Sequence, residues 1–392
     1  MKRKEKKTVC YVRSTSIVND SRASKEILSL INNGFDVIVL GWDRDNRISD
    51  YNNIYISNIK IKAKFFKHKS KYGKSINTIN GLILFQFWIY NELKSNKQNY
   101  DYIHACDFDC GYMAYKIAKK YNKKLVYDMY DYYVDSRDMP RFIKKSIEKK
   151  ENRIINYADV SIICGEWRKK QIRMTNPKKL IVIHNTPDLQ YKCSDKIIKS
   201  NSKKIKIAYV GVFQDNRLLL EILEKFKINK DFEFHIGGFG VYEKQIIDAA
   251  KNNDNIFYYG SLKYEQVLSL EADCDILFAT YNPIIKNHKY SAPNKVYEAM
   301  ALGKPIIVCK NTGIDELVIK NNTGYAIDYN AEEFVEILNK YKKDRKLLKK
   351  ISDNAKKMYK EKYSWNLMEK KLISAYNDLE KIGGINDWKK EE

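Results

Sequence analysis

The sequence contains no apolar run long enough to cross a membrane. Its longest apolar stretch, Gly81 to Tyr90, is interrupted by Gln86 and has about half of the roughly 20 residues that a spanning helix needs. The first residues, Met1 to Lys7, are charged and lead into a short apolar segment without the apolar core of a signal peptide. We therefore expect no export and no spanning helix, and we predict a cytoplasmic protein.

Cysteine pairs with metal-ligand spacing are also missing. The seven cysteines are odd in number and scattered along the chain, which fits a reducing compartment and gives no metal motif. No helix-turn-helix, zinc-finger or RNA-binding aromatic pattern occurs either. We therefore expect neither a cysteine-bound metal nor a nucleic acid partner.

Acidic residues are too few to balance the basic ones. The chain has 72 Lys and Arg against 49 Asp and Glu, a formal net charge of +23. A charge of this size favours an anionic partner, and an anionic membrane surface is the partner we favour. The alternative is a biased composition in which the lysines are solvated surface residues.

Short apolar runs alternate with helix-period segments through the whole chain. This alternation is typical of parallel sheets built from strand-helix-strand units, and 392 residues at roughly 150 per domain predict two domains. Between Asn185 and Lys204 the alternation gives way to a polar stretch typical of a linker. The predicted strands are Val9 to Val12, Asp36 to Leu40, Tyr102 to Ala105, Lys124 to Tyr127, Val160 to Cys164, Ile205 to Val210, Phe232 to Ile236, Ile256 to Tyr258, Ile276 to Ala279, Pro305 to Cys309 and Gly324 to Ile327.

The most informative segment runs from Ser291 to Val308, SAPNKVYEAMALGKPIIV. Pro293 suits a first helical position and Gly303 the left-handed position after a last turn. The amino end of this helix would present unpaired N–H groups at the carboxyl edge of a parallel sheet, which is a natural diphosphate site. Lys295 adds positive charge, and Glu298 can accept two hydrogen bonds from ribose hydroxyls. An ordinary capped helix would share these local features.

This segment resembles the nucleotide-sugar motif of retaining glycosyltransferases of family 4, the group 1 glycosyltransferases. The similar subgroup has Pro-Asn-Lys before an aromatic residue and Glu-Ala-Met. Further segments resemble the family in the same order along nearly the full length of the chain. They are Arg13 to Arg22, Gly34 to Leu40, His104 to Asp109, Leu125 to Asp131, His184 to Asp188, Tyr209 to Phe213, Gly237 to Gly240, Asn255 to Gly260, Ala272 to Ile276 and Tyr363 to Trp365.

The resemblance implies GT-B architecture, an α/β protein of two doubly wound parallel-sheet (Rossmann-like) domains facing across a cleft. Residues 1–188 would form the acceptor-binding domain, 189–204 a linker, 205–364 the nucleotide-sugar-binding domain, and 365–392 a helix returning to the first domain. The implied reaction transfers a sugar from a nucleotide-sugar donor to an acceptor hydroxyl with retention. It would need no metal or other cofactor and would serve cell-surface glycan or glycolipid synthesis.

The resemblance also assigns roles to individual residues. Glu298 would bind the donor ribose, and Lys295 would lie beside the diphosphate. The other implied donor-side positions are Ser291, Asn294, Gly211, Gly260, Arg217 and Tyr290. The implied acceptor-side positions are Asn19, Asp20, Arg22 and Asp107.

The chain departs from the family where the chemistry is expected. The usual diphosphate-clamping basic pair falls on Val212 and Leu218, so we predict Arg217 as the replacement, supported by Lys295. A glutamate that many members carry is replaced by Tyr290.

The family's frequent active-site histidine falls on Tyr130, and Asp131 takes the acidic position that follows. His104 is the remaining histidine candidate, although a lone histidine at a strand end is more often structural. The predicted catalytic residues are therefore His104, Tyr130 and Asp131. We interpret the Asp-x-Asp of Asp107 and Asp109 as acceptor-side or capping residues and not as a metal site.

Lysines gather before an aromatic-rich segment in the acceptor half. Between Lys60 and Lys74 there are seven lysines and no acid, and the apolar stretch Leu82 to Ile89 follows. This order suits docking to anionic lipid, at roughly 1 kcal/mol per lysine near the surface. We predict a peripheral position on the inner face of the cell membrane and a lipid-linked or other glycan acceptor. A flexible charged loop before a core helix is the alternative.

Two other classes of function stay open at this point. A sugar-nucleotide epimerase or hydrolase on the same scaffold would use the donor site without an acceptor. A non-catalytic nucleotide-binding scaffold protein would explain the departures at Tyr130 and Tyr290.

Overall fold

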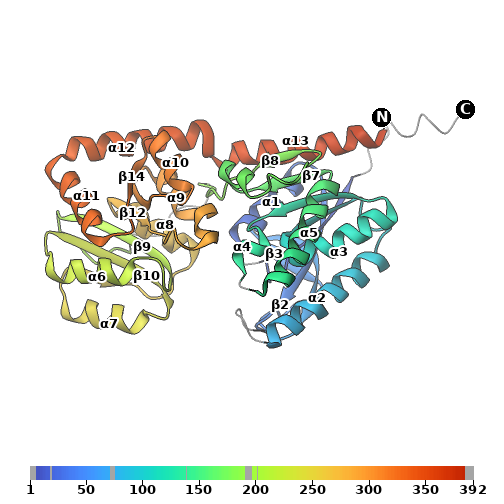
Figure 1. Cartoon of the computed structure of the whole chain (residues 1–392), viewed down its shortest axis with the longest axis horizontal. Coiled ribbons are helices and arrows are strands. Elements are labelled where there is room, and N and C mark those ends of the chain that lie inside the picture. Colours follow the sequence, from blue (N-terminus) through green and yellow to red (C-terminus); the bar gives the residue numbers. More distant parts are fainter. Residues whose placement is uncertain are drawn as a thin grey trace, which may run out of the picture. The chain divides into compact units, whose positions relative to one another are not determined.

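The computed structural model describes residues 6–17, 20–70, 76–137, 139–189, 197–200 and 202–384, without the side chains of 76–78 and 380–384. The chain divides into two compact units (Figure 1). The first consists of Met1–His184 and Met368–Glu392, and the second of Asn185–Leu367.

The first unit is built on a sheet of order β3-β4-β2-β1-β5-β6-β7-β8. Every neighbouring pair is parallel except β3 and β4. The carboxyl ends of the parallel strands therefore meet at one edge, where ligand sites of such sheets form. The strands are β1 Thr8–Val12, β2 Asp36–Asp43, β3 Asn53–Ile56, β4 Ile59–Lys67, β5 Tyr102–Cys106, β6 Lys124–Met129, β7 Val160–Ile163 and β8 Leu180–Val182.

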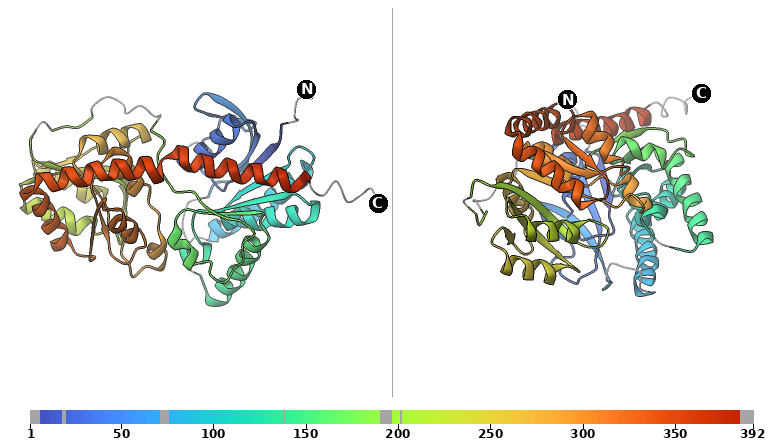
Figure 2. Two further views of the ribbon diagram at one scale, coloured as in Figure 1. Left: turned by 90° about the horizontal axis from the view of Figure 1, so that it is seen from above. Right: turned by 60° about the vertical axis from the view of Figure 1, so that its left-hand side comes forward.

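Helices α2, α3 and α5 share one hydrophobic core with the strands of this unit. The last helix, α13, also packs on the unit, because the Tyr376 ring meets the rings of Phe35 and Tyr102. Figure 2 shows this helix in red along the unit's strands and helices. The helices are α1 Ser21–Asn32, α2 Ile76–Ser95, α3 Asp107–Tyr121, α4 Tyr133–Ser136, α5 Arg141–Tyr157, η1 Glu166–Lys170 and α13 Trp365–Gly384.

The second unit has an all-parallel sheet of order β11-β10-β9-β12-β13-β14. The strands are β9 Ile205–Phe213, β10 Phe232–Gly240, β11 Ile256–Tyr258, β12 Ile276–Ala279, β13 Ile306–Cys309 and β14 Gly324–Ile327. The helices are α6 Leu219–Ile228, α7 Glu243–Asn252, α8 Tyr264–Asp273, η2 Lys286–Tyr290, α9 Asn294–Leu302, α10 Ile314–Lys320, α11 Ala331–Lys343, α12 Arg345–Met358 and η3 Tyr359–Tyr363.

The predicted α/β class with two doubly wound parallel sheets is confirmed. The sequence did not predict β3, β4 or β8, and of the stretch Lys60 to Lys74 that was considered as a charged loop, the part up to Lys67 belongs to β4. Alternating lysines on β4 point to solvent while Ile61, Ala63 and Phe65 are buried, so the lysines are one face of a strand. Among the described residues, no helix is long and apolar enough to cross a membrane.

Candidate functional site

A cavity of about 290 Å³ lies at the carboxyl edge of the second sheet. Its walls come from the ends of β9 and β10, from α8, and from the amino end of α9. Four residues predicted on the donor side line it, namely Gly211, Asn294, Lys295 and Glu298. The parallel sheet thus brings Gly211 to the same site as Asn294, Lys295 and Glu298, which follow it by more than 80 positions in the sequence.

Helix α9 supplies the positive end of a helix dipole to this cavity. It begins at Asn294, so Pro293 precedes the first helical position that was predicted for it, and it ends before Gly303, whose φ of 65° is the predicted left-handed conformation. Within the described chain, no side chain caps its amino end. Val296 N donates to the Pro293 carbonyl oxygen at 3.3 Å, while Pro293 and Asn294 line the cavity, so the positive end of the helix dipole lies beside it.

Lys295 crosses from α9 to the end of β9. Its Nζ donates a hydrogen bond to the Val210 carbonyl oxygen and lies 4.8 Å from the ring centroid of Tyr209. It also lies 3.0 Å from the point where a Cβ at Gly211 would be, so a larger residue there would meet the ammonium. Burial lowers the pKa of Lys295, and two nearby carboxylates oppose that effect. A desolvated ammonium therefore stands at the strand end where a diphosphate would bind.

Arg217 lies beside the same cavity, although it is not among the residues that line it. Its guanidinium stacks 3.7 Å from the ring centroid of Tyr281, which does line the cavity. It is close enough to Lys295 to lower the pKa of that ammonium. The two positions of the family's basic pair carry no charge, and Leu218 is buried with a φ of 56°. Arg217 and Lys295 are thus the cations that the structure brings together here.

Besides Arg217, three predicted donor-side residues do not line this cavity. The Ser291 hydroxyl donates to the His288 carbonyl oxygen at 3.0 Å, and Tyr290 precedes it at the end of η2. Gly260 reaches the cavity indirectly, because its carbonyl oxygen accepts from Gly238 N at 2.7 Å.

Sequence reasoning missed Glu271, in the last turn of α8. Its side chain is 1% exposed, and neither carboxylate oxygen has a hydrogen-bond partner within the described part of the chain. Burial raises its pKa well above the usual range, Glu298 adds to the rise, and Lys295 opposes it. A single glutamate in a helical segment gives no sequence signal of this environment.

The carboxyl edge of the first sheet brings together most of the predicted acceptor and catalytic residues. Asp107, at a φ of 58°, accepts from Arg13 Nη1, from Tyr130 N at 2.9 Å and from Asp131 N at 3.3 Å. Arg13 Nε donates to Asp20 at 2.9 Å. Burial is the largest cause that raises the pKa of Asp107, to about 6. Predicted Asn19 lies outside the described residues.

Asp131 is the most solvent-accessible acid of this group. Its side chain is 46% exposed, and its Oδ1 accepts from Nη2 of the buried Arg168 at 2.8 Å. A second cavity of the first unit, of about 410 Å³, lies at the end of β2, and its lining includes Trp42, Arg44 and Tyr55. Arg44 Nε donates to the Ser14 carbonyl oxygen at 3.1 Å, within the loop that also holds Arg13.

Arg22 lies in a buried cluster of charged groups. Its Nε and Nη2 donate to the two oxygens of Asp128 at 3.1 and 2.8 Å, and its Nη1 donates to the Ile183 carbonyl oxygen at 2.6 Å. Glu26 Oε1 lies 3.1 Å from Arg22 Nε. Asp128 and Glu26 are fully buried, so the guanidinium is their principal cation. This side chain is thus engaged inside the unit.

His104 lies in the same cluster and has no exposed surface. Its Nδ1 is 2.8 Å from the Tyr376 hydroxyl, and its ring stacks on Tyr11 with centroids 4.4 Å apart. Burial lowers its pKa, so the neutral imidazole is favoured. Because the His104 ring is fully buried, it could influence a substrate only through neighbouring side chains such as Tyr11. The Tyr11 hydroxyl is 3.3 Å from that of Tyr130.

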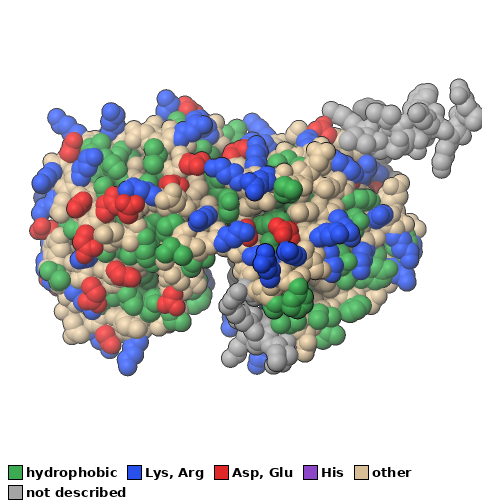
Figure 3. All heavy atoms as spheres, viewed as in Figure 1, with side chains coloured by type: hydrophobic (Ala, Val, Ile, Leu, Met, Phe, Trp, Pro, Cys, Tyr) green, Lys and Arg blue, Asp and Glu red, His purple; other side chains and the backbone are tan. Residues whose placement is uncertain are grey.

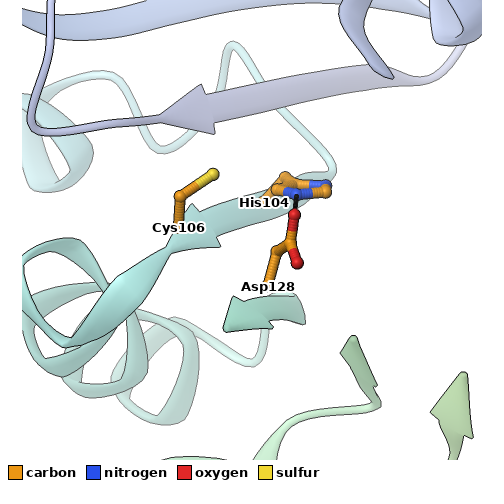
Figure 4. A group of neighbouring side chains, drawn as sticks. All are labelled: His104, Cys106 and Asp128. Atoms are coloured by element: carbon orange, nitrogen blue, oxygen red, sulfur yellow. Dashed lines mark ion pairs between the residues drawn. The ribbon is translucent and has the colours of Figure 1, made fainter. Parts of the chain in front are cut away.

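His104, Cys106 and Asp128 stand close enough to bind a metal ion in principle (Figure 4). His104 Nε2 is 3.7 Å from Asp128 Oδ2. Both Asp128 oxygens, however, already accept from Arg22, whose fixed positive charge would repel a cation. The donor set therefore suits an ion pair with Arg22 better than a metal.

Comparison with known proteins relates part of the chain to a described family. Residues 192–358 match the family model of group 1 glycosyl transferases. An uncharacterized glycosyltransferase of Methanocaldococcus jannaschii is 24% identical over 229 residues, which cover 57% of this chain and 60% of that protein. The capsular polysaccharide biosynthesis glycosyltransferase CapM of Staphylococcus aureus is 24% identical over 208 residues, 47% and 49% of the two chains. The matches thus span about half the length of these curated relatives.

Solved structures resemble this chain over almost its full length. A sucrose-phosphate synthase of Thermosynechococcus elongatus superposes with a TM-score of 0.75 at 13% identity, covering 95% of this chain and 99% of that one. The Anabaena protein HepE in complex with UDP gives 0.70 at 14% identity, covering 95% and 100%. At such identities the likeness shows the fold. The chain therefore has the GT-B fold, and its residues 192–358 resemble the group 1 glycosyl transferases.

Proposed function

We propose that the chain is a glycosyltransferase that transfers a sugar from a nucleotide-sugar donor to an acceptor hydroxyl. The observation that carries this proposal is the cavity of the second unit, where Lys295 and the amino end of α9 meet Glu298. The two positive groups suit a diphosphate, and the carboxylate suits ribose hydroxyls. HepE was solved with UDP and CapM is named for capsular polysaccharide biosynthesis, which supports a nucleotide-sugar donor and a glycan or glycolipid product.

The proposed mechanism retains the anomeric configuration and uses no metal. Lys295, Arg217 and the amino end of α9 would stabilise the charge that develops on the leaving nucleotide diphosphate. The acceptor hydroxyl would attack on the face that the nucleotide leaves. Asp107 and Asp131, with Tyr130 beside them, are the groups proposed to orient that hydroxyl.

Nucleotide release from a panel of UDP-, GDP- and ADP-sugars tests the proposal. With a membrane-lipid extract as acceptor, the wild-type protein should release nucleotide, and Glu298→Ala should weaken donor binding by roughly tenfold or more because two hydrogen bonds to a charged group are lost. Glu265→Ala, an exposed residue of α8, is the matched control. Unchanged donor affinity in Glu298→Ala would overturn the site, and release without any acceptor would favour the hydrolase or epimerase alternative.

We also propose that the first unit docks on an anionic membrane surface, where a lipid-linked acceptor would be found. Helix α2 exposes Ile79, Ile83, Leu84 and Phe87 to solvent, and Lys60, Lys62 and Lys64 point outward from β4. An ion pair joins the two elements, with Lys64 Nζ on β4 lying 2.8 Å from Glu92 Oε2 on α2. Figure 3 shows basic and apolar side chains next to one another on the visible face of this unit. Lys71 and Lys74 lie outside the described residues.

Flotation with liposomes tests this docking. Replacing Lys60, Lys62 and Lys64 with glutamine should weaken binding to phosphatidylglycerol vesicles by about two orders of magnitude, at roughly 1 kcal/mol per lysine. Neutral phosphatidylcholine vesicles should bind neither protein strongly. The control protein carries the same three substitutions in the second unit, at Lys343, Lys346 and Lys350. Equal flotation of the two triple variants would show that the β4 lysines do not face the membrane.

A further inference from the structure

Arg168 is a buried arginine that reaches a carboxylate at the surface of the first unit. It belongs to η1, the short helix after β7, and its side chain is 1% exposed. Its Nη2 donates to Asp131 Oδ1 at 2.8 Å, and the Asp131 side chain, just after β6, is 46% exposed. Strands β6 and β7 are parallel neighbours, so the segments that follow them lie at the same edge of the sheet. The two residues therefore meet at the edge that the proposed function assigns to the acceptor.

Hydrogen bonds and packing hold the Arg168 side chain in place. Its Nη1 donates to Gln171 Oε1 at 3.1 Å, and Gln171 Nε2 donates to Asp135 Oδ2 at 2.9 Å. The ring of the neighbouring Trp167 lies against Gly165, where a Cβ would come within 2.6 Å of the ring. The guanidinium is thus anchored at two of its nitrogens, on a loop that is itself closely packed.

The ion pair of Arg168 and Asp131 is costly as a purely structural feature. Arginine stays charged in proteins, and here the charge is removed from water. Its Nε has no hydrogen-bond partner among the described residues, and within the same residues Asp131 is the carboxylate that pairs with it. A buried ion pair commonly contributes no more stability than apolar side chains of similar volume. The arrangement is better explained by its effect on Asp131.

Asp131 is held from two directions. Its backbone N–H donates to Asp107 Oδ1 at 3.3 Å, and its side-chain Oδ1 accepts from Arg168. Its Oδ2 accepts no hydrogen bond from the part of the chain that the structure describes, and the side chain is accessible to solvent. One carboxylate oxygen is therefore anchored, while the other is able to accept a hydrogen bond from a ligand hydroxyl.

We propose that Arg168 is a positioning residue for the glycosyl acceptor, which fixes Asp131 by its Oδ1 so that Oδ2 accepts a hydrogen bond from the acceptor hydroxyl. This inference rests on the proposed function and adds to it how the acceptor-side carboxylate is held. A hydroxyl that meets a fixed acceptor needs less ordering before it attacks than one that meets a mobile side chain. Without Arg168, the Asp131 side chain would rotate into solvent, and the transfer step would slow while donor binding stays unchanged.

Acceptor-dependent nucleotide release by the full-length protein tests this role. The sugar nucleotide that is most active with wild type is used at saturation, with the membrane-lipid extract as acceptor. Arg168→Met should lower the acceptor-dependent rate by about 10- to 100-fold and leave the dissociation constant of the nucleoside diphosphate, measured by calorimetry, within about twofold of wild type, because the substitution misplaces only an acceptor-side group. Arg153→Met, at an exposed arginine of α5, is the matched control and should change neither quantity.

A double-mutant cycle decides whether Arg168 acts through Asp131. Asparagine at position 131 can keep the contact with Arg168 but offers an amide N–H in place of Oδ2. Asp131→Asn should therefore slow acceptor-dependent release about as much as Arg168→Met, and the double variant should be no slower than Asp131→Asn alone. If the two losses multiply, Arg168 acts through the fold and the inference is wrong.

The other outcomes separate this inference from the proposed function. A slow Asp131→Asn beside an Arg168→Met with the wild-type rate would overturn the role of Arg168 and leave the glycosyltransferase proposal standing. If wild type shows no acceptor-dependent release, both fail. Should Arg168→Met fold poorly, Arg168→Lys is taken through the same cycle, because lysine keeps a buried charge but lacks the planar donor group. It should also slow release, with no further loss when combined with Asp131→Asn, and multiplying losses would again contradict the inference.

Discussion

Replacing Lys295 with methionine is expected to lower kcat by about 10²- to 10³-fold, the usual cost of removing one preorganised donor to developing negative charge. The ammonium is held at the end of β9 by the Val210 carbonyl and stands in a partly desolvated cavity. Charge that builds up on the leaving diphosphate therefore meets a cation that needs little reorganisation. Methionine keeps the length and apolar stem of the side chain, so the loss reports the charge.

Initial rates with a saturating sugar nucleotide provide the measurement. Lys289→Met, at an exposed lysine of η2, is the matched control and should keep wild-type kcat. The kcat of Arg217→Met shows how much of the rate depends on the second cation. If Lys295→Met loses less than about tenfold and Arg217→Met loses most of the activity, Arg217 is the principal stabiliser, and the contact of Lys295 with Val210 is structural.

The sequence predicts most of the second unit and the donor side of its cavity. Short apolar strands such as Ile276–Ala279 and Ile306–Cys309 are found within one residue of the predicted bounds, because burial on both faces leaves a continuous apolar run. Helix α9 ends where Gly303 predicts and begins one residue after the start predicted from Pro293. Such local signals need no knowledge of the tertiary structure.

The missed features depend on contacts between distant segments. Strand β4 alternates lysine with apolar residues. Its many lysines favoured a charged loop in the sequence, although the apolar face of the strand is buried. Glu271 is an ordinary helical glutamate in sequence and becomes a buried carboxyl group only because α8 packs against α9 and β9. The hydrogen bonds of Arg22 to Asp128, 106 residues later, likewise cannot be predicted from a local sequence pattern.

Replacing Arg22 with methionine is expected to destabilise the first unit by about 3–5 kcal/mol, the cost of leaving one side of a buried ion pair uncompensated. The guanidinium makes two hydrogen bonds to Asp128, one to the Ile183 carbonyl and an ion pair with Glu26. Methionine can fill part of the volume but offers no donor. Chemical denaturation followed by circular dichroism, fitted to allow separate transitions for the two units, measures the loss.

The pH dependence gives this prediction a second, independent readout. Arg22 and His104 hold the pKa of Asp128 below its usual range, against the effect of burial. A depressed folded-state pKa contributes stability that is present above the unfolded-state value and is lost as pH falls through the folded-state value. The acid-side loss of stability of the first unit should therefore begin at higher pH in Arg22→Met than in wild type. Asp128→Asn should reduce that difference, because it removes the titrating carboxylate. If Arg22→Met keeps wild-type stability but binds acceptor weakly, the guanidinium contacts substrate, as the family resemblance implies, and the buried ion pair contributes little to the fold.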